Sequence, residues 1–101
     1  MYTFRGMNER EFMVFARAYQ FRGMQMSVPT IEALWQYFVN KDQAGSFLHA
    51  VLCNDLKVAV GNADDYNLRN IPVYLAFLWN CAPTSAWGSP ENVENWLKGT
   101  D

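Results

Sequence analysis

The sequence has few of the features by which enzyme families are recognised. Its 101 residues include one histidine and two cysteines, and its six glycines are scattered, so neither GxGxxG nor GxxxxGK[ST] occurs. A glycine-rich phosphate cradle is therefore not expected. The two cysteines, Cys53 and Cys81, form no CxxC pair and lie within apolar stretches. This context favours reduced core thiols over a nucleophile or a metal site.

Charge is also sparse. Charged residues make up 18% of the chain, with 8 Lys and Arg against 10 Asp and Glu, and no basic block occurs. Nucleic-acid binding needs cations that neutralise phosphates, so we expect no direct nucleic-acid partner. The longest apolar run, around VYLAFLW, is far shorter than the roughly 20 residues that span a bilayer. The N-terminus lacks a basic region followed by an apolar run, so we expect a cytoplasmic protein without membrane contact.

Hydrophobic residues, by contrast, are abundant. They make up 50% of the chain, and aromatic residues alone make up 16%. A chain of this length buries only about 65% of its unfolded surface, so some aromatic side chains should remain exposed. We therefore expect a surface for self-association or for a partner, and a homodimer or higher oligomer.

Capping signals and apolar periodicity predict helices along most of the chain. Asn8 and Glu11 form a capping box, which predicts a helix over about residues 9–21, ended by Gly23. Weak alternation over residues 1–5 suggests a short strand that pairs with residues 24–28. The predicted buried stripe of this helix repeats at helical spacing: Phe12, Phe15, Ala16 and Tyr19.

Further helices are predicted in the middle of the chain. One begins at Pro29, with Ile31, Leu34, Trp35 and Phe38 on its buried face, and ends in the polar stretch 40–45. Ser46 is the predicted cap of a helix over 47–53. Asp55 is the predicted cap of a helix over 56–61, in which Val58 and Ala59 pack inward.

The last third of the chain is helical at both ends. Residues 64–81 have helical periodicity but include Pro72, so the helix either restarts there with Asn70 as its cap or is continuous and kinked. Ser89, followed by proline, is the predicted cap of a final helix that ends at Gly99.

Together these patterns predict an all-α fold, a compact bundle of five to six short helices with a short N-terminal strand or hairpin. We expect residues 1–101 to form a single domain. Within it we expect an N-terminal arm over 1–8, N-terminal helices over 9–44 and a helical core over 45–98.

Only His49 and Asp64 offer acid–base chemistry, and they define the hypothesis of a small enzyme of unrecognised type. We predict that His49 is a partly buried structural residue, because metal binding or general-base catalysis would need further ligands or a carboxylate nearby. Asp64 precedes a helix, where a carboxylate serves the backbone. The sequence therefore favours a protein with no catalytic residues, no metal and no cofactor.

An Asn- and Asp-rich stretch between residues 54 and 70 offers a binding site instead. At helix ends such residues usually serve the backbone, but Asn67 falls within a helix. With Trp87, and with Tyr66 as a second wall, they would form a pocket for a planar polar ligand such as a nucleobase. The predicted ligand-binding residues are Asn54, Asp55, Asp64, Asn67, Trp87 and Ser89.

Residues 45–97 resemble a group of short, mostly uncharacterised proteins of tailed bacteriophages and prophages, with the pattern GxFLxAVLxNDL, AD, N and PxxxWGSP. Trp79 departs from that pattern, which has tyrosine there. The resemblance implies a phage accessory protein that acts in a bacterial host by stoichiometric binding. The matching residues are Gly45, Phe47, Leu48, Ala50 to Leu52, Asn54 to Leu56, Ala63, Asp64, Asn67, Pro83 and Trp87 to Pro90.

The resulting hypothesis is a non-enzymatic protein that counters a host defence system by binding a host protein. The contact surface would then be the exposed aromatic and methionine residues of the N-terminal region: Phe4, Met7, Phe21 and Met24. One alternative is a sponge that sequesters a nucleotide second messenger in the Asn- and Asp-rich pocket. Others are the small enzyme and a virion or assembly component.

Overall fold

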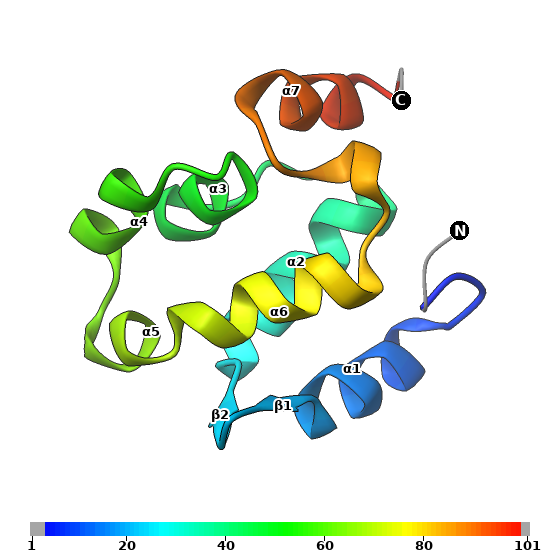
Figure 1. Ribbon diagram of the computed structural model, residues 1–101. Coiled ribbons are helices and arrows are strands. Elements are labelled where there is room, and N and C mark those ends of the chain that lie inside the picture. Colours follow the sequence, from blue (N-terminus) through cyan, green and yellow to red (C-terminus); the bar gives the residue numbers. More distant parts are fainter. Residues whose placement is uncertain (1–3, 100–101) are drawn as a thin grey trace.

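The computed structural model describes residues 4–99, which form seven α-helices and a two-stranded hairpin (Figure 1). The predicted all-α class is confirmed, and a short hairpin is present, but the strand at residues 24–25 pairs with residues 20–21, which were predicted to be helical. The elements are α1 (Glu9–Ala18), β1 (Gln20–Phe21), β2 (Met24–Gln25), α2 (Val28–Asn40), α3 (Ser46–Leu52), α4 (Leu56–Asn62), α5 (Asp65–Arg69), α6 (Ile71–Cys81), the 3-10 turn η1 (Thr84–Ala86) and α7 (Pro90–Lys98).

Most helices begin where the sequence places a polar cap. The capping box of α1 is present, with the Glu11 amide donating to the Asn8 side chain at 2.8 Å and the Asn8 amide donating to Glu11 at 2.9 Å. Side-chain caps also begin α4, α5 and α7, at Asp55, Asp64 and Ser89. The predicted cap of α3 is wrong. Gly45 rather than Ser46 holds the N-cap position, so no side chain caps this helix.

The hairpin takes the place of the last turn predicted for the first helix. Arg22 and Gly23 both have positive φ, 53° and 81°, which is the conformation of a tight two-residue hairpin turn. Gly23 therefore reverses the chain between β1 and β2 and does not end α1. The strands pair antiparallel, with Phe21 opposite Met24. The predicted strand partner at residues 1–5 lies mostly outside the described residues.

The ambiguity at Pro72 is resolved in favour of a restart. Asn70 lies between α5 and α6, and Pro72 stands in the first turn of α6, where a missing amide hydrogen does no harm. The Asn70 side chain does not cap α6. It donates instead to the Tyr66 carbonyl at 2.7 Å and so closes α5. This break contributes to a helix count above the predicted five to six.

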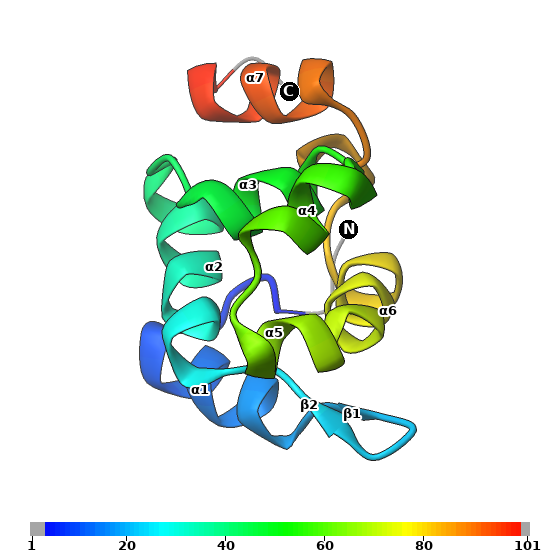
Figure 2. The same cartoon turned by 90° about the vertical axis from the view of Figure 1, so that its left-hand side faces the viewer.

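One hydrophobic core joins the N-terminal helices to the rest of the chain. Figures 1 and 2 show α2 and α6 in the middle of the molecule, with α1 and the hairpin toward one end and α7 at the other. Aromatic rings from three elements meet between them. Phe4 contacts Phe12 edge-on, with ring centroids 5.0 Å apart, and also packs against Phe38 and Phe77. The core extends from Phe4 to Trp96 without interruption.

Candidate functional site

Hydrogen bonds from two other elements hold the backbone around Trp87. The Gly88 amide donates to the carbonyl of Leu52 at the end of α3, at 2.7 Å. The Asn92 side chain in α7 donates to the Trp87 carbonyl at 2.9 Å. These two bonds fix the position from which the Trp87 indole projects.

Tyr37 in α2 anchors the residue before Trp87. Its side chain is fully buried, and its hydroxyl donates to the Ala86 carbonyl at 2.6 Å. Burial, with the nearby Cys53 thiol as a smaller cause, raises the pKa of Tyr37 well above its usual value. The hydroxyl therefore stays protonated and donates at all physiological pH values.

Gly88 supplies the turn that separates Trp87 from the cap of α7. Its φ is +104°, a backbone conformation that residues other than glycine rarely adopt. A Cβ there would meet only the Asn92 side chain, at 3.9 Å. The requirement for glycine therefore comes from the backbone conformation rather than from lack of space.

Asn54 is held at the end of α3 by a Schellman motif. The Asp55 amide donates to the Ala50 carbonyl at 2.8 Å, and the Asn54 amide donates to the Val51 carbonyl at 3.0 Å. Asn54 has the left-handed conformation that this motif needs, with φ 61°. Its backbone therefore ends the helix, and its exposed side chain faces a cavity.

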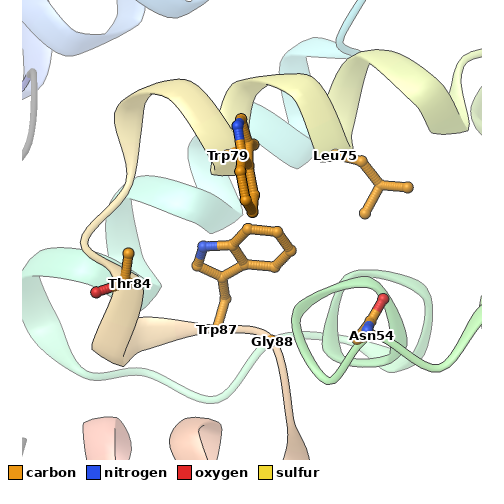
Figure 3. Close-up of a pocket in the computed structure, with 6 residues that line it drawn as sticks. All are labelled: Asn54, Leu75, Trp79, Thr84, Trp87 and Gly88. Atoms are coloured by element: carbon orange, nitrogen blue, oxygen red, sulfur yellow. The ribbon is translucent and has the colours of Figure 1, made fainter.

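That cavity lies between α6, the end of α3 and the Trp87 segment, and it has a volume of about 520 Å³. In Figure 3 the Trp79 indole projects from α6 toward the Trp87 indole, while Leu75 and Asn54 face each other further along. Its lining is mainly apolar, which is typical of ligand and peptide sites. The lining residues are Asn54, Leu75, Trp79, Thr84, Trp87 and Gly88.

A second cavity of about 100 Å³ adjoins the first, because Asn54 and Leu75 line both. We call the two together the α6 groove, with a wide compartment of about 520 Å³ and a narrow compartment of about 100 Å³. The narrow compartment lies between α4 and α6. It is lined by Val51, Asn54, Asp55, Leu56, Ala59, Ile71 and Leu75.

The two compartments differ in charge. The wide compartment is lined by uncharged residues, whereas the acidic residue Asp55 is among those that line the narrow one. Among the described residues that line the α6 groove there is no Lys or Arg. The groove therefore favours uncharged or cationic groups over anions.

Apolar side chains are also exposed around the groove. Trp79 is 78% exposed and Leu56 is 61% exposed. In α4 the structure buries only Ala59, so the prediction that Val58 packs inward is wrong. The reason is that α4 is short and packs mainly against α3, which covers one of its faces and leaves the others largely open. This side of the molecule thus presents an apolar surface next to an open groove.

The structure separates the residues predicted to bind a ligand. It brings Asn54 and Trp87 together in the wide compartment and places Asp55 in the narrow one. Asp64 and Ser89 line neither compartment, and each accepts a hydrogen bond from the backbone of its own helix.

Asn67 and Tyr66 also lie outside the groove. The Asn67 side chain accepts a hydrogen bond from the Tyr74 hydroxyl, and the Tyr66 hydroxyl donates to the Gln25 carbonyl at 2.9 Å. Both side chains attach α5 to its neighbours. The expectation that Tyr66 forms a wall opposite Trp87 is therefore wrong. Trp79 takes that position, because α6 carries it to the mouth of the wide compartment.

The predicted N-terminal partner surface is less exposed than expected. Phe4 is only 3% exposed, so the prediction that it lies on the surface is wrong. The turn that precedes α1 directs its ring into the core, against Phe12 and Phe38. Half-buried residues that also pack against the core make up the rest of that predicted surface: Met7, Phe21 and Met24.

His49 is partly buried, and its ring lies beside Cys53. The His49 Nε2 atom is 3.5 Å from the Cys53 Sγ atom, and the buried Nδ1 atom has no hydrogen-bond partner among the described residues. The sequence shows the four-residue spacing of this pair. Burial, and secondarily the Asp55 carboxylate, raise the pKa of the Cys53 thiol. The pair therefore lacks the stabilised thiolate of a cysteine nucleophile.

Asp64 and His49, the two acid–base groups of the enzyme hypothesis, have separate roles. Asp64 caps α5 through the Asn67 amide, at 2.7 Å, and His49 contacts Cys53 in α3. Neither residue lines the α6 groove. Within residues 4–99, no three His, Cys, Asp or Glu side chains are placed to hold a metal ion.

The described part of the chain contains no helix that is both long enough and apolar enough to cross a membrane. Comparison of the chain with known protein families, with curated proteins and with solved structures found no match.

Proposed function

We propose that this protein is a non-enzymatic binding protein of the phage accessory type, which counters a host defence system by binding a host protein. Its contact site is the α6 groove. The observation that carries this proposal is Trp79, an indole that is 78% exposed at the mouth of an apolar cavity of about 520 Å³. Exposed tryptophans beside a pocket are typical of the residues that dominate protein–protein contacts.

The structure around the groove supports binding without rearrangement. Hydrogen bonds of the Gly88 amide and of the Trp87 carbonyl hold one wall, and the Schellman motif at Asn54 holds another. The third wall is α6, whose other face is buried in the core. Walls that are already ordered lose little conformational entropy when a partner binds.

A nucleotide is the second candidate ligand, because Trp79 and Trp87 offer two indole rings and Asn54 a nearby amide. A base would find stacking and hydrogen-bonding partners there. Its phosphates would find none of the cations that usually bind them, since the described lining of the groove has no Lys or Arg. The charge distribution therefore favours a protein partner over a phosphorylated ligand.

A homodimer is the alternative occupant of the same surface. A second copy of the chain that covers Trp79 and Leu56, which a monomer leaves in water, would exclude a host protein from the groove. Light scattering of wild type and Trp79→Ala at several concentrations tests this alternative. A homodimer that depends on the groove dissociates in the variant, whereas a monomer in both cases would show that the groove is free for another partner.

The test of the proposed function compares two variants that each truncate an exposed apolar side chain, one at the groove and one away from it. Trp79→Ala removes the indole at the groove, and Val14→Ala removes an apolar side chain, 66% exposed, from α1. Each protein is expressed in a bacterial host and captured, and bound proteins are quantified by mass spectrometry. A specific partner is retained by wild type and Val14→Ala and is lost by Trp79→Ala, and it binds the purified wild-type protein directly.

A thermal melt with cyclic and linear nucleotides separates the two candidates. A tight ligand at saturating concentration raises the melting temperature by several degrees through mass action. We expect no such shift. A shift that Trp79→Ala abolishes would contradict the host-protein proposal and favour the nucleotide sponge.

A further inference from the structure

The α6 groove has an internal order that restricts what it can bind. Trp79 and Trp87 line only the wide compartment, whereas Asp55 lines only the narrow one. Asn54 and Leu75 line both and so lie at their junction. A ligand that fills the groove therefore meets two indole rings, then Leu75 and Asn54 at the junction, then the narrow compartment beside the exposed residue Asp55.

From this order we propose that the groove binds a partner segment with a large apolar, an aliphatic and a basic side chain in line. The basic group lies beside Asp55. This inference rests on the proposed function and adds the chemical class of the partner.

The sizes of the compartments assign the two apolar side chains. The wide compartment, at about 520 Å³, accommodates an aromatic ring between Trp79, Trp87 and Leu75. Aromatic pairs gain about 0.5–1.5 kcal/mol beyond the burial of their surface. The narrow compartment, at about 100 Å³, is walled by Ala59, Ile71 and Leu56 and has room for an aliphatic side chain rather than an indole.

Asp55 determines the sign of the charge. One carboxylate oxygen accepts from the Val58 amide at 3.2 Å as the cap of α4, and the residue is exposed. A carboxylate has further acceptor positions on its second oxygen, which can bind an ammonium or guanidinium group. A carboxylate on the partner would face the negative charge of Asp55 and no positive charge, because no described Lys or Arg lines the groove.

The test uses two matched synthetic peptides and the full-length protein labelled with ¹⁵N. The first is acetyl-Trp-Ser-Leu-Ser-Lys-amide, and the second has Glu in place of Lys. Alternate side chains of an extended chain point to one side, so Trp, Leu and Lys can enter the groove together. Both peptides are also made with reversed sequence, so that both chain directions are tested. Binding is followed by the indole N–H signals of Trp79 and Trp87.

We expect the Lys peptide to shift both indole signals and to bind about threefold to tenfold more tightly than the Glu peptide at low salt. The preference should decrease as salt is added. A Lys peptide with Trp in place of Leu should bind more weakly, because the narrow compartment is too small for an indole.

Two aspartate variants locate the charge effect. Asp55→Asn removes the carboxylate but keeps a good helix cap, so α4 should stay folded. Asp64→Asn makes the same change of net charge at the cap of α5, outside the groove. The preference for Lys over Glu should disappear in Asp55→Asn and persist in Asp64→Asn.

The outcomes separate this inference from the proposed function. If both peptides move the indole signals equally, or if Asp55→Asn keeps the preference, the assigned partner chemistry is wrong while the groove stands as a binding site. If no peptide at millimolar concentration moves either indole signal, the assigned partner chemistry is also wrong, and the capture experiment with Trp79→Ala alone decides the proposed function.

Discussion

Trp79 and Trp96 are identical side chains on two helices near the C-terminus, and their surroundings are opposite. The Trp96 ring is 4% exposed, its indole N–H donates to the Tyr37 carbonyl at 3.1 Å, and the Lys41 ammonium lies 3.2 Å above its centroid. The Trp79 ring is 78% exposed at the mouth of the α6 groove.

The difference shows which of the two tryptophans stabilises the fold. Trp96 is buried between α2 and α7 with its polar hydrogen bonded, as a structural indole must be. Trp79 leaves most of its apolar area in water, so that area does not stabilise the fold. The same area stabilises a complex when a partner covers it. The following substitutions run from the core indole, through the segment that holds Trp87, to the surface indole.

The largest expected effect is that of Trp96→Ala. Truncation of a buried tryptophan destabilises a protein by about 3–5 kcal/mol, because contacts are lost and a cavity remains. Urea denaturation followed by circular dichroism measures the change in the free energy of unfolding. A loss below about 1 kcal/mol would mean that Trp96 is not part of the core.

The next effect is that of Tyr37→Phe, which removes the hydroxyl that holds the Trp87 segment. The buried Ala86 carbonyl loses its donor, so we expect a loss of about 1–3 kcal/mol. Tyr66→Phe is the matched control, because that hydroxyl also donates to a carbonyl but the side chain is 41% exposed. Equal losses in the two variants would contradict the role of burial.

Gly88→Ala should destabilise the protein by about 1 kcal/mol or more, because alanine is strained at this positive φ. It should also shift the Trp87 indole signal, since Gly88 turns the chain next to it. Gly61→Ala is the control, because Gly61 lies within α4 with open space around it. There alanine should stabilise the helix slightly, by about 0.5–1 kcal/mol. Similar effects of the two changes would rule out the backbone argument.

The smallest effect on stability is expected for Trp79→Ala. A surface substitution usually changes the free energy of unfolding by no more than about 0.5 kcal/mol. The same variant should lose the captured host protein and the peptide response at Trp87. A large loss of stability, measured by urea denaturation, would make Trp79 a structural residue and remove the contrast with Trp96.

The sequence predicts the helices well where the signals are local. The capping box at Asn8, the cap at Asp55 and the proline after Ser89 each involve residues within one helical turn. The hairpin is different, because Arg22 and Gly23 reverse the chain only when the two short strands pair beside α6. A glycine after a helical pattern is compatible both with the end of a helix and with a hairpin turn, so the local sequence does not distinguish the two.

The candidate site was predicted in part. The sequence predicts that Asn54 and Trp87 bind a ligand, and both line the wide compartment, whereas in the sequence Trp79 is notable only as a departure from a pattern. Periodicity could not reveal its role, because its position on the helix shows only which side it faces. Whether another element covers that side depends on α3, which lies far from it along the chain, and on how the loop after α6 turns Trp87 back toward it.

The sequence by itself determined where most helices begin and end and which stripe of each helix is apolar, because both depend on residues within a turn or two of one another. Only the tertiary structure decided that α4 stays nearly uncovered and that Trp79 meets Trp87 across a groove. The physical reason is that burial and cavities arise from contacts between distant segments. Burial of an apolar side chain is favourable, but only the packing of the whole chain decides whether that side chain is buried.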